Sequence, residues 1–175
     1  MKRRGLFTFL AAAVASLPLA ALAAPQDTAR IERQVRKELV TLSFYSVFDN
    51  FQYKVDGGMV TLMGDVTRPR LKKSAERVVM RIEGVDKVDN QINVLPVSPN
   101  DDRIRTATFR AIYYHPMLTR YAIQAIPPIH IIVENGDVTL EGVVSTEGEK
   151  NAAGIQANGV TGSFTVTNNL RVVRD

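Results

Sequence analysis

The sequence predicts an α+β fold made of two tandem units, each running helix, strand, strand, helix, strand. The first observation is an internal repeat: residues 51–95 align with residues 129–173 without a gap, and 13 of the 45 positions are identical. Chance alone would give about three identities, at roughly 6% per position for ordinary composition. The second observation is a pair of turn signals, Gly57-Gly58 and Asn135-Gly136, each set between two runs of alternating apolar and polar residues. This pattern is typical of a β-hairpin.

The elements of the first unit follow from the spacing of its apolar residues. Helical spacing predicts the first helix, and period-two alternation predicts the two strands of the hairpin, whose turn glycines are both expected to take a positive φ. Pro69 suits the first turn of the second helix, and Gly84 is placed to end that helix in the left-handed conformation. The residues expected to face inward are, in chain order, Ile31, Val35, Leu39, Leu42, Phe51, Tyr53, Val55, Val60, Leu62, Gly64, Val66, Leu71, Ala75, Val78, Ile82, Val88, Ile92 and Val94.

The second unit repeats this order, with five extra residues between its first helix and its first strand. Asp101 or Asp102 can cap the first helix of this unit, and Pro116 forces its end. The expected boundaries are 28–96 for the first unit, 97–101 for the linker and 102–174 for the second unit. Each unit should form a small three-stranded sheet with two helices on one face. Because a unit of about 70 residues buries only roughly 60% of its surface, we expect the two units to contact each other.

Residues 1–23 are predicted to be a secretory signal peptide. Three bases at residues 2–4 precede an acid-free apolar run that ends in Ala21-Leu22-Ala23, which predicts cleavage between Ala23 and Ala24. The remaining chain has 19 bases and 18 acids, a net charge of +1, which argues against tight binding to nucleic acid. We therefore expect a periplasmic protein. The alternative, an uncleaved N-terminal anchor, is disfavoured by Pro18 within the apolar run.

No residue pattern in the chain predicts a catalytic centre. Cysteine is absent, which excludes a disulfide framework, a thiolate metal site and a cysteine nucleophile. His115 and His130 are the only histidines, and neither has neighbours at the spacing of metal ligands. The glycine-rich and nucleophile motifs of common enzymes are missing as well. The sequence therefore predicts a protein that is not an enzyme, with no metal, no cofactor and no small-molecule substrate.

A basic stripe on the second helix of the first unit is the main candidate for binding. Its members are spaced three, four and four residues apart: Arg70, Lys73, Arg77 and Arg81. Such a stripe can lie against the headgroups of an anionic membrane, where each cation contributes about 1 kcal/mol. The alternative is an ordinary solvated helix face on which Glu76 and Glu83 partner the cations.

A second candidate surface is the outer face of the second sheet. Ile132 and Val143 are expected to be exposed there, at positions where the first unit has Lys54 and Asp65. This apolar pair would suit a contact between the units or with another protein. Aromatic residues after the first helix of each unit are expected to close the gap between helix and sheet rather than to enter a membrane. They are Phe44, Tyr45, Phe48, Tyr113, Tyr114 and Tyr121.

The paired motifs resemble the BON domain (bacterial OsmY and nodulation). The first copy has V-D-G-G-M-V-T-L-M-G followed by G-V-D-K-V-D-N-Q-I-N-V at residues 84–94, and the second has N-G-D-V-T-L-E-G and V-T-N-N-L-R-V. A signal peptide before two such units is similar to the osmotically inducible periplasmic protein family. Ser163 and the glycines at 154 and 159 depart from the family pattern. The resemblance implies a non-enzymatic envelope role, with binding to phospholipid surfaces or other envelope components under stress.

Two functions are therefore expected from different classes. The first is weak, salt-sensitive binding to anionic phospholipid surfaces through the first unit, in support of envelope integrity or stress tolerance. The alternative is a periplasmic protein-interaction or chaperone-like module that uses Ile132 and Val143. Added salt should separate them, because it screens contacts with headgroups but not apolar contacts.

Overall fold

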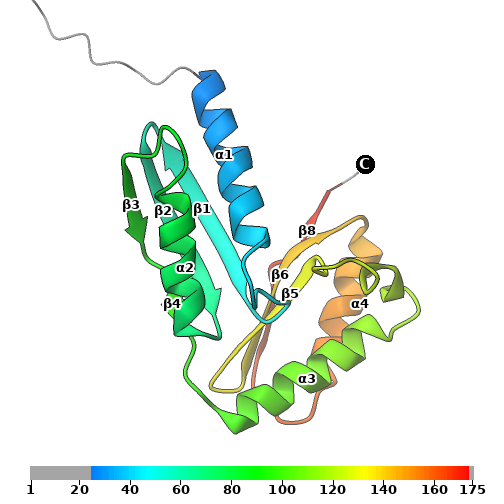
Figure 1. Cartoon of the computed structure of the whole chain (residues 1–175). Helices are drawn as coiled ribbons and strands as arrows, with labels where there is room; N and C mark the ends of the chain where they lie inside the picture. The colour runs from blue at the N-terminus through cyan, green and yellow to red at the C-terminus, as the bar shows by residue number, and fades with distance from the viewer. Residues whose placement is uncertain (1–24, 174–175) are drawn as a thin grey trace, which may run out of the picture.

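The computed structural model describes residues 25–173, so the predicted signal peptide and its cleavage site lie outside the described residues. The first unit has the predicted order of elements (Figure 1). Its elements are α1 (Pro25–Val40), β1 (Asn50–Asp56), β2 (Met59–Val66), α2 (Pro69–Val79), β3 (Lys87–Asn90) and β4 (Asn93–Val94).

The sheet of the first unit has β2 at its centre. Strand β1 pairs with β2 in antiparallel register, and β3 and β4 both pair with β2 in parallel register. The predicted third strand is thus divided in two at Gln91 and Ile92. The Gln91 backbone N–H still donates to the Leu62 carbonyl at 2.8 Å, while the Ile92 side chain is buried in the core. The register with β2 is the same on both sides of this break, Leu62 with Asn90 and Asp65 with Asn93, so β3 and β4 are two parts of one strand.

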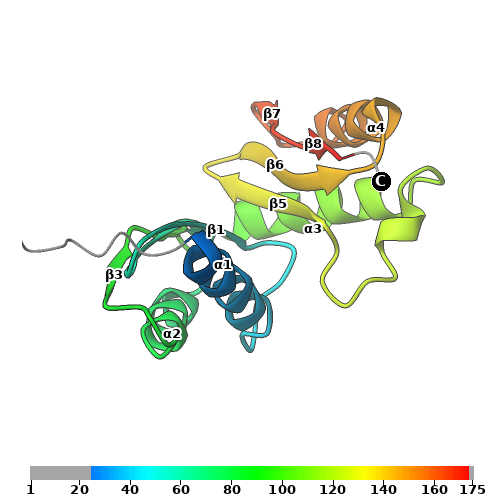
Figure 2. The same cartoon turned by 90° about the horizontal axis from the view of Figure 1, so that it is seen from above.

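Helices α1 and α2 cover the same face of this sheet, as predicted (Figure 2). One residue of the apolar stripe predicted for α2 is wrong. Val79 is buried, whereas Val78, the predicted residue, is only half-buried. In the turn of the hairpin Gly57 has a positive φ of 58° but Gly58 does not, so only half of that expectation is correct. The buried core consists of Ile31, Val35, Leu39, Val60, Leu62, Val66, Leu71, Ala75, Val79, Ile82 and Ile92.

The second unit repeats the architecture with β6 at the centre of its sheet. In its hairpin Asn135 and Gly136 both have a positive φ, at 54° and 87°. The five extra residues lie between α3 and β5, in the segment that contains the short 3-10 helix η1. The elements are α3 (Pro99–Tyr113), η1 (Thr119–Tyr121), β5 (Ile129–Glu134), β6 (Asp137–Val144), α4 (Glu147–Asn158), β7 (Val166–Asn168) and β8 (Arg171–Val172).

The start of α3 differs from the prediction. The helix begins at Pro99, inside the expected linker, and its N-cap is Ser98, whose hydroxyl accepts a hydrogen bond from the Asp101 backbone N–H at 3.2 Å. The Asp101 side chain is buried and instead accepts hydrogen bonds from the backbone N–H groups of Asn135 and Gly136. Asp101 therefore holds the β5–β6 hairpin against the helix, and the expectation that an aspartate caps α3 is wrong.

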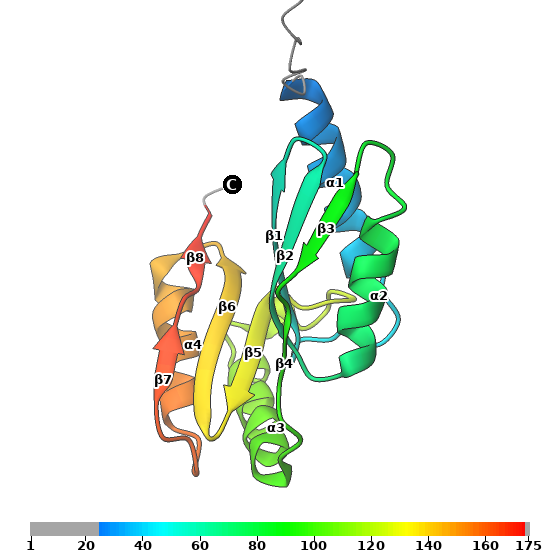
Figure 3. The ribbon, with the colours of Figure 1, turned by 90° about the vertical axis from the view of Figure 1, so that its left-hand side faces the viewer.

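The two units meet along the β5 edge of the second sheet, which lies beside the lower end of the first sheet (Figure 3). The Ile131 backbone N–H donates a hydrogen bond of 2.7 Å to the Val47 carbonyl in the loop between α1 and β1. Val47 is 8% exposed and packs into the core of the second unit, together with half-buried Phe48. The expected contact between the units is thus made by one loop that inserts apolar side chains into the neighbouring core.

Candidate functional site

Helix α2 presents an apolar face to its own sheet and a basic face to water. Pro69 occupies the first turn, where a missing N–H costs nothing, and Leu71, Ala75 and Val79 are buried at helical spacing. All four cations of the predicted stripe are exposed. Their spacing of three and four residues places them on the side of the helix that faces away from the core.

The structure brings three of the four stripe residues together in one groove. Lys73, Arg77 and Arg81 line a groove of about 560 Å³, with Lys87 of β3 on its other side. We call this the α2–β3 groove. Arg70 does not line it; the Arg70 guanidinium lies 5.5 Å from the ring centroid of Phe44. Sequence reasoning missed Lys87, because only the path of the chain after α2 places β3 beside the helix.

The α2–β3 groove has a strong excess of positive charge. Glu76 is its only lining carboxylate among the described residues, and the Glu76 carboxylate accepts a hydrogen bond of 2.9 Å from the Asn90 amide. Within residues 25–173 the ion pairs are Arg105 with Asp102 and Arg120 with Glu149. None of the four cations of the groove is therefore neutralised by an ion pair there. Met80, which is 51% exposed, adds an apolar side chain to the groove.

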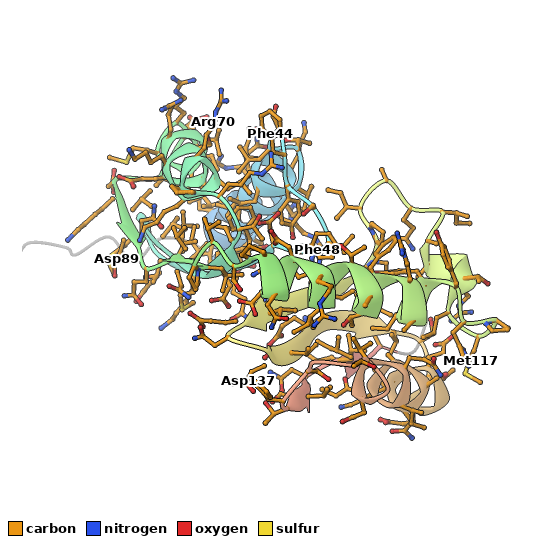
Figure 4. The ribbon with its side chains drawn as sticks, turned by 90° about the horizontal axis from the view of Figure 1, so that it is seen from below. Phe44, Phe48, Arg70, Asp89, Met117 and Asp137 are labelled. Atoms are coloured by element: carbon orange, nitrogen blue, oxygen red, sulfur yellow. The ribbon has the colours of Figure 1, made fainter. Side chains whose placement is uncertain are left out.

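Phe44 marks a second feature at the N-terminal end of α2. Its side chain is 56% exposed and its backbone has a φ of 73°, a conformation that non-glycine residues rarely adopt. The guanidinium groups of Arg68 and Arg70 lie 5.1 Å and 5.5 Å from the ring centroid. Figure 4 shows Phe44 and Arg70 next to each other on the helical side of the first unit. Unlike Tyr45, which packs in the first core, Phe44 does not fill a gap between helix and sheet.

The predicted apolar pair on the outer face of the second sheet is not an exposed pair. Ile132 is 6% exposed and belongs to neither core, and its neighbour Ile131 is bonded to the loop of the first unit. Val143 is half-buried. The expectation that Ile132 is exposed is therefore wrong, while its expected part in a contact between the units stays a prediction. Of the two apolar side chains expected to contact a protein partner on this face, only Val143 is partly exposed.

His130 lies in the contact between the units. Its ring stacks on Tyr45 with the centroids 5.7 Å apart, and its Nδ1 is buried with no hydrogen-bond partner among the described residues. Burial is the largest influence and lowers the pKa of His130, while the backbone and carboxylate of Asp49 and the backbone of Ser46 raise it in part. The prediction that His130 is an ordinary surface histidine misses this contact, which depends on the placement of the two units.

The described residues offer no metal centre and no membrane-spanning helix. No group of three or more His, Asp or Glu side chains in residues 25–173 could hold a metal ion. His115 is in a different setting from His130: its Nδ1 accepts a hydrogen bond from the Met117 backbone N–H at 3.3 Å. Over the same residues no helix combines the length and the apolar character needed to cross a bilayer.

Solved structures similar to this chain share little sequence with it. CdsD, a structural protein of the type III secretion system of Chlamydia trachomatis, is 12% identical with a TM-score of 0.31, covering 83% of this chain and 93% of that chain. The C-terminal domain of CdsD is 11% identical with a TM-score of 0.28, covering 81% and 96%. These scores are too low to support an inference. A search of the curated proteins gives no match.

A comparison with models of known protein families gives two matches that together cover most of the chain. The BON domain model matches the chain twice, over residues 26–96 and 100–174, and the two matches span the helix–strand–strand–helix–strand units described above. Proteins with this domain are typically periplasmic or associated with the cell envelope, and the domain is generally non-catalytic. The chain belongs to the BON domain family and contains two copies of the domain in tandem.

Proposed function

We propose that this protein is a non-enzymatic envelope protein that binds anionic phospholipid surfaces peripherally through its first unit. The observation that carries the proposal is the α2–β3 groove, where Lys73, Arg77, Arg81 and Lys87 face one another around a single carboxylate. Phosphate-bearing headgroups match this charge, and exposed Met80 can contact the acyl boundary. In the periplasm, such binding would support envelope integrity or stress tolerance.

The expected strength of binding is modest. Each Lys or Arg near an anionic surface contributes about 1 kcal/mol, so four cations give roughly 4 kcal/mol at low salt, reduced by the nearby Glu76. Physiological salt screens exposed charges beyond about 8 Å. The protein should therefore bind reversibly and be released by salt. The second unit adds little to this attraction, because residues 97–175 contain seven bases and eight acids.

The test is co-sedimentation of residues 24–175 with vesicles of phosphatidylcholine alone or mixed with phosphatidylglycerol, at low and high salt. A groove variant carries Lys73→Gln, Arg77→Gln, Arg81→Gln and Lys87→Gln. A matched control removes four exposed cations elsewhere in the first unit, with Arg33→Gln, Arg36→Gln, Lys37→Gln and Lys54→Gln. Both variants have the same net charge, so a general charge effect would weaken them equally.

We expect the unmodified protein and the control to bind only the vesicles that contain phosphatidylglycerol, and to dissociate at high salt. The groove variant should lose most of this binding. Equal binding by the groove variant and the control, or no binding by the unmodified protein, would contradict the proposal. Binding that survives high salt would instead favour an apolar contact.

A further inference from the structure

A second groove lies between the two units and is separate from the α2–β3 groove. Its volume is about 390 Å³, and residues from four segments line it: the loop after α1, the connection between β2 and α2, the linker and helix α3. We call it the inter-unit groove. Figure 4 shows Phe48 lying next to α3, where its ring meets that of Phe109 edge-on at 6.2 Å. Both units are therefore needed to form the groove.

The apolar part of the inter-unit groove is unusually open to water. Val97 of the linker is 95% exposed, and Phe44 is 56% exposed. Phe44 also holds a left-handed backbone conformation, with a φ of 73°, which is unfavourable for a non-glycine residue. Single exposed apolar residues are common, but apolar side chains gathered around one groove indicate a contact surface. These side chains suit a hydrocarbon chain.

The polar part of the inter-unit groove carries an excess of positive charge. Arg68 and Arg105 line it with one carboxylate, that of Asp102. Arg105 is 4% exposed; its guanidinium binds Asp102 and the Val133 carbonyl, and its Nε has no hydrogen-bond partner among the described residues. The Arg68 guanidinium lies over the Phe44 ring and has no ion pair within residues 25–173. An anion beside Arg68 and Arg105 would complement this charge.

The shape of the inter-unit groove favours a small ligand over a peptide strand. Its lining residues lie in loops, in the linker and on a helix, so no strand edge is available to pair with an extended peptide. Its volume is near the lower end of the roughly 300–1,000 Å³ range of small-molecule sites, which often lie between domains. That volume fits one acyl chain better than two.

We propose that the inter-unit groove binds a single-chain amphiphile with an anionic head, such as a fatty carboxylate or an alkyl phosphate. The head lies beside Arg68 and Arg105, and the chain lies along Phe44, Phe48 and Val97. This proposal does not depend on membrane binding through the α2–β3 groove, because the ligand is a dissolved monomer and not a lipid surface.

The test is isothermal titration of residues 24–175 with decanoate, decyl phosphate and decanol, each below the concentration at which it aggregates. Decanoate and decyl phosphate distinguish the two possible heads, and decanol lacks the charge. We expect one molecule of at least one anionic amphiphile to bind per chain, and decanol to bind at least about tenfold more weakly, since a charge-assisted hydrogen bond is worth about 1.5–3 kcal/mol. No binding by either anion, or equal binding by decanol, would overturn the proposal.

Two variants test whether the amphiphile binds in the inter-unit groove. Arg68→Gln and Val97→Asp change exposed side chains of the inter-unit groove, and each should weaken anionic-amphiphile binding at least about tenfold. Their matched controls are Arg33→Gln, which changes an exposed cation of α1 that lines neither groove, and Val173→Asp, which replaces a valine that is 50% exposed elsewhere. The controls should bind like the unmodified protein. If the controls and the groove variants lose affinity equally, the ligand binds elsewhere and the proposal is wrong.

Discussion

The His130 ring stacks on the Tyr45 ring with their centroids 5.7 Å apart, and this contact joins the second sheet to the loop of the first unit. Tyr45 stacks in turn on Phe51 of β1 at 5.0 Å. The nearby Asp49 carboxylate is fully buried and already accepts hydrogen bonds from the backbone N–H and hydroxyl groups of Ser46 and Thr67. Burial disfavours a proton on the His130 ring, and the backbone and carboxylate of Asp49 and the backbone of Ser46 offset this effect only in part.

This arrangement predicts that mild acid destabilises the folded protein. Because burial lowers the pKa of His130 below the value of about 6.5 found in unfolded chains, the unfolded state binds the proton first as the pH falls. Stability should thus be constant above about pH 6.5 and fall below it, with a slope of at most about 1.4 kcal/mol per pH unit for one proton. Urea denaturation followed by circular dichroism between pH 7.5 and about pH 5 measures this slope.

The control for this prediction keeps the ring and removes the titration. His130→Phe can still stack on Tyr45, so the fall in stability over this pH window should become shallower. His115→Gln replaces the other histidine, whose Nδ1 is bonded to Met117, and should keep the slope of the unmodified protein. If His130→Phe shows the original slope, protonation of His130 is not the cause of the loss of stability in acid.

A glycine at the centre of each sheet should be irreplaceable. Gly142 has a φ of 117°, and a Cβ there would lie 1.9 Å from the Pro128 carbonyl oxygen. Gly142→Ala should therefore destabilise the protein by more than about 2 kcal/mol, through both strain and the clash with backbone. Gly148→Ala is the matched control in α4, because the nearest atom is Thr146 Oγ1 at 3.8 Å. That change should be neutral or stabilise by up to about 1 kcal/mol. Thermal melting compares the two, and equal midpoints would refute the argument.

The same side-chain bridge occurs in both units and gives a third prediction. The Asn168 amide donates to the Lys150 carbonyl at 2.8 Å, and its oxygen accepts from the Leu170 N–H at 3.2 Å. Asn90 makes the equivalent bonds to Lys72 and Ile92. Asn168→Ala removes both bonds and leaves the Leu170 backbone N–H without this partner, so it should cost about 1–3 kcal/mol.

Asn158→Ala is the control for this bridge. Asn158 is exposed, and its amide binds only the Gly154 carbonyl one helical turn away. Its loss should cost less than about 0.5 kcal/mol, because water replaces the bond. Denaturant midpoints followed by circular dichroism are the suitable measurement, since the chain has no tryptophan. A cost for Asn168→Ala no greater than that of the control would show that the bridge does not hold the helix to the last strand.

The features that could be predicted from the sequence are those set by local patterns. The hairpin turn at Asn135-Gly136 follows from its demand for positive φ, and the helix–sheet layering follows from the periodicity of apolar residues. The inward place of Asn90 and Asn168 on the last strand also follows from alternation. Predictions failed where the position of a side chain depends on a partner that is distant in the sequence. Asp101 binds the β5–β6 hairpin instead of capping α3, a choice that local sequence does not reveal.

The candidate site divides in the same way. Helical spacing predicts that Lys73, Arg77 and Arg81 share one face, and the structure places them along one groove. Lys87 joins them only through the pairing of β3 with β2, and Arg70 turns towards Phe44. The burial of Ile132, which is 6% exposed, does not follow from the alternation of β5, which predicts this residue on the outer face of the sheet.

The last prediction concerns the loop that joins the units. Val47 lies in the first unit, but its side chain is only 8% exposed and packs in the core of the second unit. Its backbone carbonyl accepts a hydrogen bond from the Ile131 N–H. Val47→Ala should therefore destabilise the second unit by about 1–3 kcal/mol, because it removes buried methyl groups and leaves a cavity. Val40→Ala at the end of α1, where the side chain is 40% exposed, should cost less than about 0.5 kcal/mol. Hydrogen exchange resolved by residue locates the effect: with Val47→Ala, amides of β5 and β6 should exchange faster while those of α2 keep their protection. If the faster exchange is confined to the first unit, the loop does not belong to the second core.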